Sequence, residues 1–274
     1  MTVLYFADTR FPIERANGAQ TMGTCQALAA RGHDVTLVVR PDRAPQPRDP
    51  FDFYGLPHVD RLTITTVPAR RGARANRVRF LLAALALSMA RRDALVYTRD
   101  LGIAAFLLQM PASRRPRLIY ESHGIAPMVS AEMPRLLGRP DLIPSPAKLR
   151  RLDRRERRVW TRAAAYVTIT AALADDLRAR YGPRAGLFVV PDGARDSSAT
   201  APVTPDATAG PTVVGYAGHL YPWKGVDIFV HALALLPQVH GLIVGGHPGE
   251  SDRTRIDTLA RTLGVGDRLR ITGL

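Results

Sequence analysis

Short apolar segments rich in β-branched residues recur along the chain, and amphipathic segments lie between them. The short segments do not alternate apolar with polar positions, which is typical of parallel strands covered on both faces. The predicted strands of residues 1–193 are Val3–Ala7, Val35–Val39, Leu62–Val67, Leu95–Tyr97, Leu118–Tyr120, Tyr166–Thr170 and Leu187–Val190. The predicted helices are Ala19–Arg31, Arg74–Arg92, Leu101–Met110, Lys148–Ala165 and Ala171–Tyr181. This alternation predicts a doubly wound α/β domain over residues 1–193.

Residues 194–211 lose this periodicity and are rich in Ser, Thr, Ala and Pro, which predicts an interdomain linker. The pattern restarts in residues 212–274. The strands predicted there are Val213–Ala217, Val239–Gly245 and Leu269–Thr272, with helices at Gly225–Leu236 and Ser251–Leu263. An unfinished parallel sheet leaves an open edge and apolar surface. We therefore expect residues 212–274 to be a partial second Rossmann-type domain that is cut short.

Composition adds a strong positive charge. The chain has 38 Lys and Arg residues against 24 Asp and Glu, for a net charge of +14, and its hydrophobic fraction of 46% excludes an intrinsically disordered chain. Lys148 and Lys224 are its only lysines, so arginine carries the excess. Basic residues gather in residues 70–79 and 148–162. Such patches favour anionic partners (phosphate-bearing ligands, lipid headgroups or nucleic acid), and a solvated helix face is the alternative interpretation.

The sequence also predicts a cytoplasmic location. Cys25 is the only cysteine and cannot form an internal disulfide. The N-terminus lacks the basic region of a signal peptide, and the longest apolar run, Phe80–Ala90, is too short to span a bilayer.

Several polar motifs follow predicted strands of the first domain, where open α/β sheets bind ligands. Asn17-Gly18-Ala19 precedes a helix: the glycine permits close backbone approach and the helix N-terminus attracts an anion, although a simple turn is the alternative. His123, in Glu121-Ser122-His123-Gly124, is suited to bind a hydroxyl or stabilise developing charge, or else caps a loop. Thr98-Arg99-Asp100 and Pro191-Asp192-Gly193 follow two other strands. No Gly-x-Gly-x-x-Gly follows any strand, which argues against an NAD-linked oxidoreductase.

The second domain offers a stronger combination. Gly218 and His219 leave its first strand, and Lys224-Gly225 opens the following helix. Backbone amides, a helix N-terminus and one cation are what a diphosphate requires. Gly245 and Gly246 end the next strand, where we expect them to lie against a base or a ribose.

Five motifs occur in the order found in a known family: Asn17-Gly18-Ala19, Tyr120-Glu121-Ser122-His123-Gly124, Val190-Pro191-Asp192-Gly193, Gly215-Tyr216-Ala217-Gly218 with Lys224-Gly225-Val226-Asp227, and Val244-Gly245-Gly246. Together they resemble the family 4 glycosyltransferases of the GT-B fold, and the similarity covers the whole chain. The resemblance implies two Rossmann-type domains and transfer of a sugar from a UDP- or GDP-linked donor with retention of configuration. It implies no metal and no other cofactor, and the absence of an Asp-x-Asp motif agrees with this.

The resemblance assigns roles to individual residues. His123 would lie beside the transferred sugar, and Lys224 would neutralise the departing diphosphate. Gly18 and Gly218 would approach the diphosphate, together with His219, which stands where the family usually has an arginine. The residues implied at the nucleotide are Gly245, Gly246 and Gly273.

The family also has two glutamates, which contact the donor sugar and the ribose, and a terminal helix beyond the point that corresponds to Leu274. We therefore expect residues 1–274 to bind the donor poorly and to turn over slowly or not at all. The acceptor expected is a glycan or a lipid-linked acceptor. A basic patch lies where related enzymes touch membranes and comprises Arg70, Arg71, Arg74, Arg77 and Arg79. At about 1 kcal/mol per arginine it favours peripheral binding to an anionic surface such as the inner face of the plasma membrane.

Other functions are compatible with parts of this pattern. A non-catalytic glycosyltransferase remnant that binds an acceptor or a partner subunit fits the early end of the chain. An epimerase would need catalytic carboxylates, for which Glu121 is a candidate without a clear partner. A phosphorylase would need a pyridoxal-linked lysine, a context that neither lysine has. A nucleic-acid-binding protein is disfavoured because aromatic residues are only 7% of the chain and do not interleave with the arginine clusters.

Overall fold

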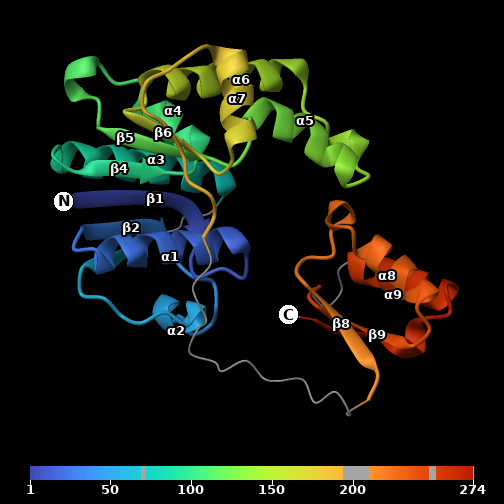
Figure 1. The fold of residues 1–274 in the computed structure, drawn as a ribbon. Helices are drawn as coiled ribbons and strands as arrows, with labels where there is room; N and C mark the ends of the chain where they lie inside the picture. The colour runs from blue at the N-terminus through green and yellow to red at the C-terminus, as the bar shows by residue number, and fades with distance from the viewer. Residues whose placement is uncertain (69–71, 194–209, 247–250, 274) are drawn as a thin grey trace. The chain divides into compact units, whose positions relative to one another are not determined.

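The computed structural model describes residues 1–68, 72–193, 210–246 and 251–273 (Figure 1). The chain forms two compact units, one of residues 1–130 and 144–194 and the other of residues 131–143 and 195–274. Residues 131–143 thus group with the second unit, whereas the sequence analysis places them in the first domain. The predicted linker at 194–211 falls largely outside the described residues, so its limits stay a prediction.

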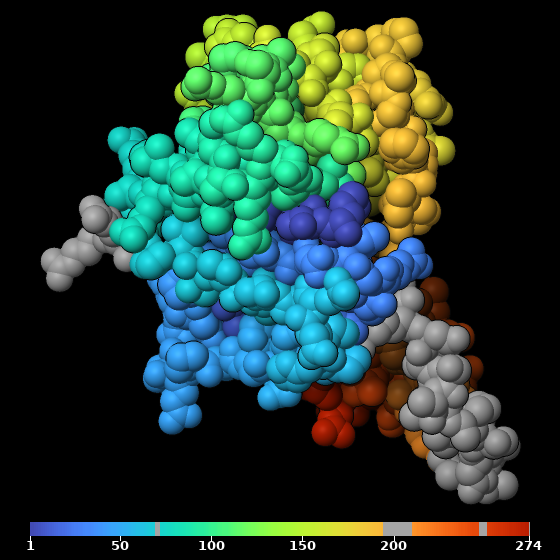
Figure 2. Space-filling view, turned by 90° about the vertical axis from the view of Figure 1, so that its left-hand side faces the viewer, coloured from blue at the N-terminus to red at the C-terminus, as the bar shows by residue number. Residues whose placement is uncertain are grey.

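The first unit is built on one parallel sheet of seven strands in the order β3-β2-β1-β4-β5-β6-β7. Its strands are β1 (Thr2–Arg10), β2 (Asp34–Arg40), β3 (Leu62–Thr66), β4 (Leu95–Thr98), β5 (Leu118–Ser122), β6 (Ala165–Thr168) and β7 (Leu187–Val189). Every neighbouring pair is parallel, which confirms the predicted architecture. In Figure 2 the dark blue N-terminal residues lie between blue and green surfaces, as expected for a central β1.

Helices connect these strands. They are α1 (Ala16–Ala30), α2 (Pro50–Tyr54), α3 (Ala73–Ala90), α4 (Leu101–Leu107), α5 (Ala126–Leu136), α6 (Pro146–Arg162) and α7 (Ala171–Tyr181), with short 3-10 turns η1 (Ala112–Arg114) and η2 (Pro140–Leu142). Helices α2 and α5 were not predicted. Five residues are too few to show a helical period in α2, which begins where Asp49 accepts two backbone hydrogen bonds. Helix α5 contains Pro134, and a proline within a segment argues against a helix in a sequence-based prediction.

The sheet is covered on both faces, as its continuous apolar strands predict. Leu4 and Phe6 of β1 pack in one core with α3, α4, α6 and α7. Val3 and Tyr5, which point to the opposite face, pack in a second core with α1 and α2. All four side chains are at most 1% exposed. Burial on both faces is as expected for β1, which lies in the interior of the sheet between β2 and β4.

The second unit contains a smaller parallel sheet in the order β10-β9-β8. Its elements are β8 (Thr212–Ala217), η3 (Pro222–Lys224), α8 (Val226–Leu235), β9 (Val239–Val244), α9 (Ser251–Thr262), η4 (Gly266–Arg268) and β10 (Leu269–Gly273). Helices α8 and α9 pack on the sheet through apolar residues such as Val230 and Ile256. All three predicted strands are present. In the part of the chain that the structure describes, no helix combines the length and apolar character needed to span a bilayer.

Candidate functional site

Polar side chains gather at the carboxyl edge of the first sheet, where β1, β4 and β5 end. They surround a pocket of about 310 Å³. Its polar lining includes Asp8, Asn17, Thr21, Arg99, Asp100 and His123. Parallel strands direct all their C-terminal loops to one edge, so motifs distant in the sequence meet there. The Asn17, Arg99 and His123 motifs are accordingly brought together.

His123, predicted to be catalytic, lines this pocket directly after β5. Its Nε2 lies 2.6 Å from Oε1 of Glu121, and its Nδ1 lies 3.0 Å from Nη2 of Arg99. A guanidinium can only donate a hydrogen bond, so Nδ1 is the acceptor and the ring carries its proton on Nε2. Both ring nitrogens are thus engaged by protein groups. A ligand hydroxyl can bond to the ring only by replacing one of them, so the catalytic role of His123 stays a prediction.

Glu121 organises this cluster. The Tyr97 hydroxyl donates a short hydrogen bond to its second carboxylate oxygen, and Nε of Arg99 lies 3.4 Å from its first. Burial raises the pKa of Glu121, but hydrogen bonds from His123 and Tyr97 and the positive charge of Arg99 outweigh it, so the pKa lies below its ordinary value. Glu121 is therefore an anionic acceptor that orients His123.

The Asp192 carboxylate comes from the motif after β7. It lies with Glu121 and His123 in a group whose possible ligand atoms are all within 4.8 Å of one another. Such spacing is compatible with a cation, but Glu121 and His123 are already bonded to each other and to Arg99. A metal ion would have to displace these contacts. Whether the reaction is independent of metal stays a prediction.

A network of charges adjoins the pocket through Asp8 and Asp100, which line it. The Asp8 carboxylate, with a side chain only 2% exposed, pairs with Arg40 and lies 2.6 Å from Nη1 of Arg77. Arg77 also makes two hydrogen bonds, of 2.6 and 2.7 Å, to Asp100. Burial raises the pKa of Asp100, but the hydrogen bonds and charge of Arg77 outweigh it and lower the pKa overall. Arg77 therefore ties α3 to the ends of β1 and β4.

Arg77 is a member of the predicted basic patch, and its two ion pairs reduce the positive charge that the patch presents. Arg74 is exposed and Arg79 is half-buried, both on α3. Arg70 and Arg71 lie outside the described residues. Since two carboxylates already neutralise Arg77, Arg74 and Arg79 carry what remains of the patch in the described part of α3, and membrane binding stays a prediction.

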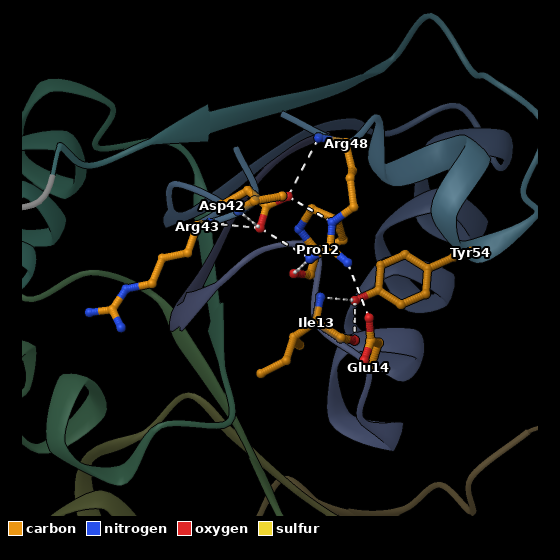
Figure 3. Close-up of polar contacts among 8 residues, drawn as sticks. Pro12, Ile13, Glu14, Asp42, Arg43, Arg48 and Tyr54 are labelled. Atoms are coloured by element: carbon orange, nitrogen blue, oxygen red, sulfur yellow. Dashed lines mark hydrogen bonds and ion pairs between the residues drawn. The ribbon is translucent and has the colours of Figure 1, made fainter. Parts of the chain in front are cut away.

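Gly18 lies inside the first turn of α1, because the helix begins at Ala16 and not at the predicted Ala19. A Cβ on Gly18 would overlap the Tyr54 hydroxyl and would come within 2.9 Å of the Ile13 carbonyl oxygen. That hydroxyl accepts from the amide of Ile13 and donates to its carbonyl, both at 2.9 Å (Figure 3). Packing against Tyr54 is thus a sufficient reason for glycine at position 18, and its predicted contact with the donor stays a prediction.

Arg48 holds the same loop from the other side (Figure 3). Its Nε donates to Asp42 over 2.8 Å, while its terminal nitrogens reach the Pro12 carbonyl at 3.3 Å and Glu14 at 3.2 Å. The hydrogen bond from Arg48 lowers the pKa of Asp42. Arg48 and Tyr54 therefore fix the backbone that leads from β1 to Asn17 at the pocket.

In the second unit, four glycines predicted to approach the nucleotide and its phosphates converge at the carboxyl ends of β8, β9 and β10. A Cβ on Gly245 would overlap the carbonyl oxygen of Gly218, and Gly245 forms a bridge to Gly273. Gly246 and Gly273 both have φ of +83°. Side chains are excluded here by close backbone contact and by φ values that favour glycine. The structure thus brings these four glycines together, and their contact with a nucleotide is still a prediction.

The loop between β8 and α8 carries the remaining predicted residues. The rings of His219 and Tyr221 stack at 5.0 Å, and those of Tyr221 and Trp223 stack at 4.7 Å. The Tyr216 hydroxyl donates to the His219 carbonyl over 2.8 Å. Lys224 is exposed, and no carboxylate of the described ranges pairs with it. The stacked rings thus order a loop that ends in an uncompensated cation.

Two further cations were missed as site residues by sequence reasoning. Arg99 belongs to a motif that was placed after a strand without a role, yet it reaches both Glu121 and His123. Arg253, in the first turn of α9, has no motif around it and lies beside Gly246 and Gly273. For Arg99 its place after a strand was a usable signal. For Arg253 the sequence offered no such signal.

Comparison with known proteins agrees with this organisation. The glycosyl transferase 4-like domain matches residues 17–193. Three solved structures share the fold at identities too low to carry function. A sucrose-phosphate synthase from Thermosynechococcus elongatus is 19% identical with a TM-score of 0.69, over 99% of this chain and 70% of that one. HepE from Anabaena, solved with UDP and glucose, is 18% identical with a TM-score of 0.68, over 100% of this chain and 69% of that one.

The third, WaaG, a glycosyltransferase involved in lipopolysaccharide biosynthesis, is 16% identical with a TM-score of 0.60, over 99% of this chain and 70% of that one. No curated protein sequence matches the chain. The likenesses confirm a GT-B-like fold of two Rossmann-type units, and the chain spans about 70% of the length of these structures. Since the family match covers more than half of its length, the chain belongs to the glycosyl transferase 4-like family.

Proposed function

We propose that the chain is a glycosyltransferase that takes a sugar from a nucleotide-diphosphate donor, with retention of configuration and without a metal. The observation that carries the proposal is the convergence of Gly218, Gly245, Gly246 and Gly273 at one sheet edge. The cluster carries no side chains, and the exposed Lys224 in the turn ahead of α8 provides a cation of the kind that a diphosphate needs. HepE, which has the same fold, was solved with UDP.

In this proposal Lys224 offsets the negative charge that grows on the diphosphate as the sugar departs. A charge-assisted hydrogen bond of this kind contributes about 1.5–3 kcal/mol, or about 10- to 100-fold in affinity. Lys224 has no competing carboxylate within the described ranges, so its charge is available to a ligand.

The pocket of the first unit is the proposed acceptor side. The carboxylates of Asp8, Asp100 and Glu121 are all paired with arginines, so the lining presents oriented donors and acceptors with little net charge. This favours a ligand rich in hydroxyl groups, such as a glycan or the sugar of a lipid-linked acceptor. Arg74 and Arg79 are the described residues through which α3 would meet an anionic membrane, and co-sedimentation with vesicles that does not depend on anionic lipid would refute this part.

Calorimetric titration with UDP and with GDP tests the proposal. We expect one nucleotide to bind, and Lys224→Ala to weaken it about 10- to 100-fold. Lys148→Ala is a matched control, because Lys148 is the other lysine and lies exposed on α6. No binding of either nucleotide by the folded wild-type chain would contradict the proposal. Product anomer analysis by NMR, with and without EDTA, tests retention and independence from metal.

A further inference from the structure

A guanidinium from α9 lies against the glycine cluster of the second unit. Arg253 is half-buried. Its Cβ is 3.9 Å from the position that a Cβ on Gly246 would take, and its Nη1 is 3.5 Å from the corresponding position on Gly273. Its Nη2 donates a long hydrogen bond of 3.4 Å to the Ile271 carbonyl. The side chain therefore runs from the end of β9 to the end of β10.

The charge of Arg253 is not balanced by its surroundings. The neighbouring acids Asp227 and Asp252 both pair with Arg255, which also donates to the Leu220 carbonyl over 3.0 Å. Within residues 210–246 and 251–273, no carboxylate pairs with Arg253. A half-buried cation that no carboxylate neutralises is stabilised when an anion binds beside it.

We propose that Arg253 is the second cation of the nucleotide-diphosphate site, acting with Lys224. This inference rests on the proposed function and adds to it a residue from α9. The resemblance places an arginine directly after Gly218, where this chain has His219, whose ring is stacked on Tyr221 at an interplanar angle of 20°. Arg253 supplies from another element the planar, permanently charged fork that His219 lacks.

The test measures the affinity for whichever of UDP and GDP the wild-type chain binds, at low and at high salt. We expect Arg253→Gln to weaken binding about tenfold or more at low salt, and to make binding less sensitive to salt, because one ionic contact is lost. Arg253→Lys should restore part of the affinity. Arg261→Gln is the matched control, because Arg261 is exposed and lies about 12 Å further along α9.

Each possible result of this experiment either supports or overturns the proposed role of Arg253. Unchanged affinity in Arg253→Gln, with nucleotide still bound by the wild-type chain, overturns the role of Arg253 and leaves the proposed function standing. Failure of the wild-type chain to bind either nucleotide overturns both. A loss that is equal at both salt concentrations and is accompanied by a lower Tm would assign Arg253 a structural role and overturn the inference. A loss confined to low salt at unchanged Tm supports it.

Discussion

The buried carboxylate of Glu156 is expected to be one of the most stabilising polar groups of the first unit. Glu156 lies on α6, has no exposed surface, and accepts hydrogen bonds from the Tyr166 hydroxyl at 2.6 Å and from the Ala126 amide at 3.0 Å. Glu156→Ala leaves the buried Tyr166 hydroxyl and the part-buried Ala126 amide without an acceptor. At about 1–3 kcal/mol for each donor, the free energy of unfolding should fall by about 2–6 kcal/mol.

Glu156→Gln separates hydrogen bonding from charge. The glutamine oxygen can accept from Ala126 while its amide donates to the Tyr166 oxygen, so we expect a change within about 1 kcal/mol. Burial raises the pKa of Glu156 above its ordinary value. Ionisation therefore costs the folded state free energy at neutral pH. As the pH falls from 7 towards 4.5, the wild-type chain should gain stability relative to Glu156→Gln, because the folded state takes up the proton first.

Urea denaturation followed by tryptophan fluorescence measures both effects. The chain has one tryptophan in each unit, so in a Trp223→Phe background only Trp160 reports, and it lies beside Tyr166 at a ring distance of 5.0 Å. Glu14→Ala is the control, since the Glu14 side chain is 58% exposed and should change stability by less than about 0.5 kcal/mol. A loss in Glu156→Gln as large as in Glu156→Ala would refute the reasoning, because the charge itself would then be required.

Two further predictions concern the ends of the two sheets. Arg77→Met should lower stability by about 1–3 kcal/mol at pH 7, and less near pH 3, because Asp100, whose pKa Arg77 holds down, contributes stability only while ionised. Urea titrations at the two pH values measure this, and an equal loss at both would contradict it. Gly245→Ala should abolish nucleotide binding and lower the Tm, because its Cβ overlaps the Gly218 carbonyl, whereas Gly264→Ala, which strains a glycine in open space, should lower the Tm alone. Calorimetry and thermal unfolding separate these outcomes, and intact binding in Gly245→Ala would be the contrary result.

The local sequence pattern was sufficient to predict the bounds of helices and strands that have clear capping residues or continuous apolar runs. Helix α7 has its predicted bounds, because Thr170 caps its first turn and Gly182 follows its last residue. The ten strands of the described residues were all predicted to within a few residues, since continuous β-branched runs have few alternatives in a sheet buried on both faces. Pattern also placed Gly218 and Gly245 at the ends of neighbouring strands, and the ends of parallel strands share one edge, whereas Gly273 was named only by the family resemblance.

Tertiary structure decided what each polar residue is bonded to. Arg77 was predicted to be a surface cation, but it donates hydrogen bonds to Asp8, which is 69 positions away, and to Asp100. His123 was predicted to be available to a ligand, yet Glu121 and Arg99 occupy both ring nitrogens. These partners lie on separate elements, and no local pattern records which of several arginines reaches a given carboxylate.

The sequence by itself therefore determined the order of the strands and of the helices other than α2 and α5, the two parallel sheets, and the sheet edges at which the polar motifs lie. Periodicity and glycine positions depend on each residue's own neighbours and suffice for that. Some charged side chains pair with other groups of the fold, and others stay available to a ligand. Distances between separate elements decide which of the two occurs. Arg253 illustrates this, since only the packing of α9 against β9 and β10 brings its guanidinium to the glycines.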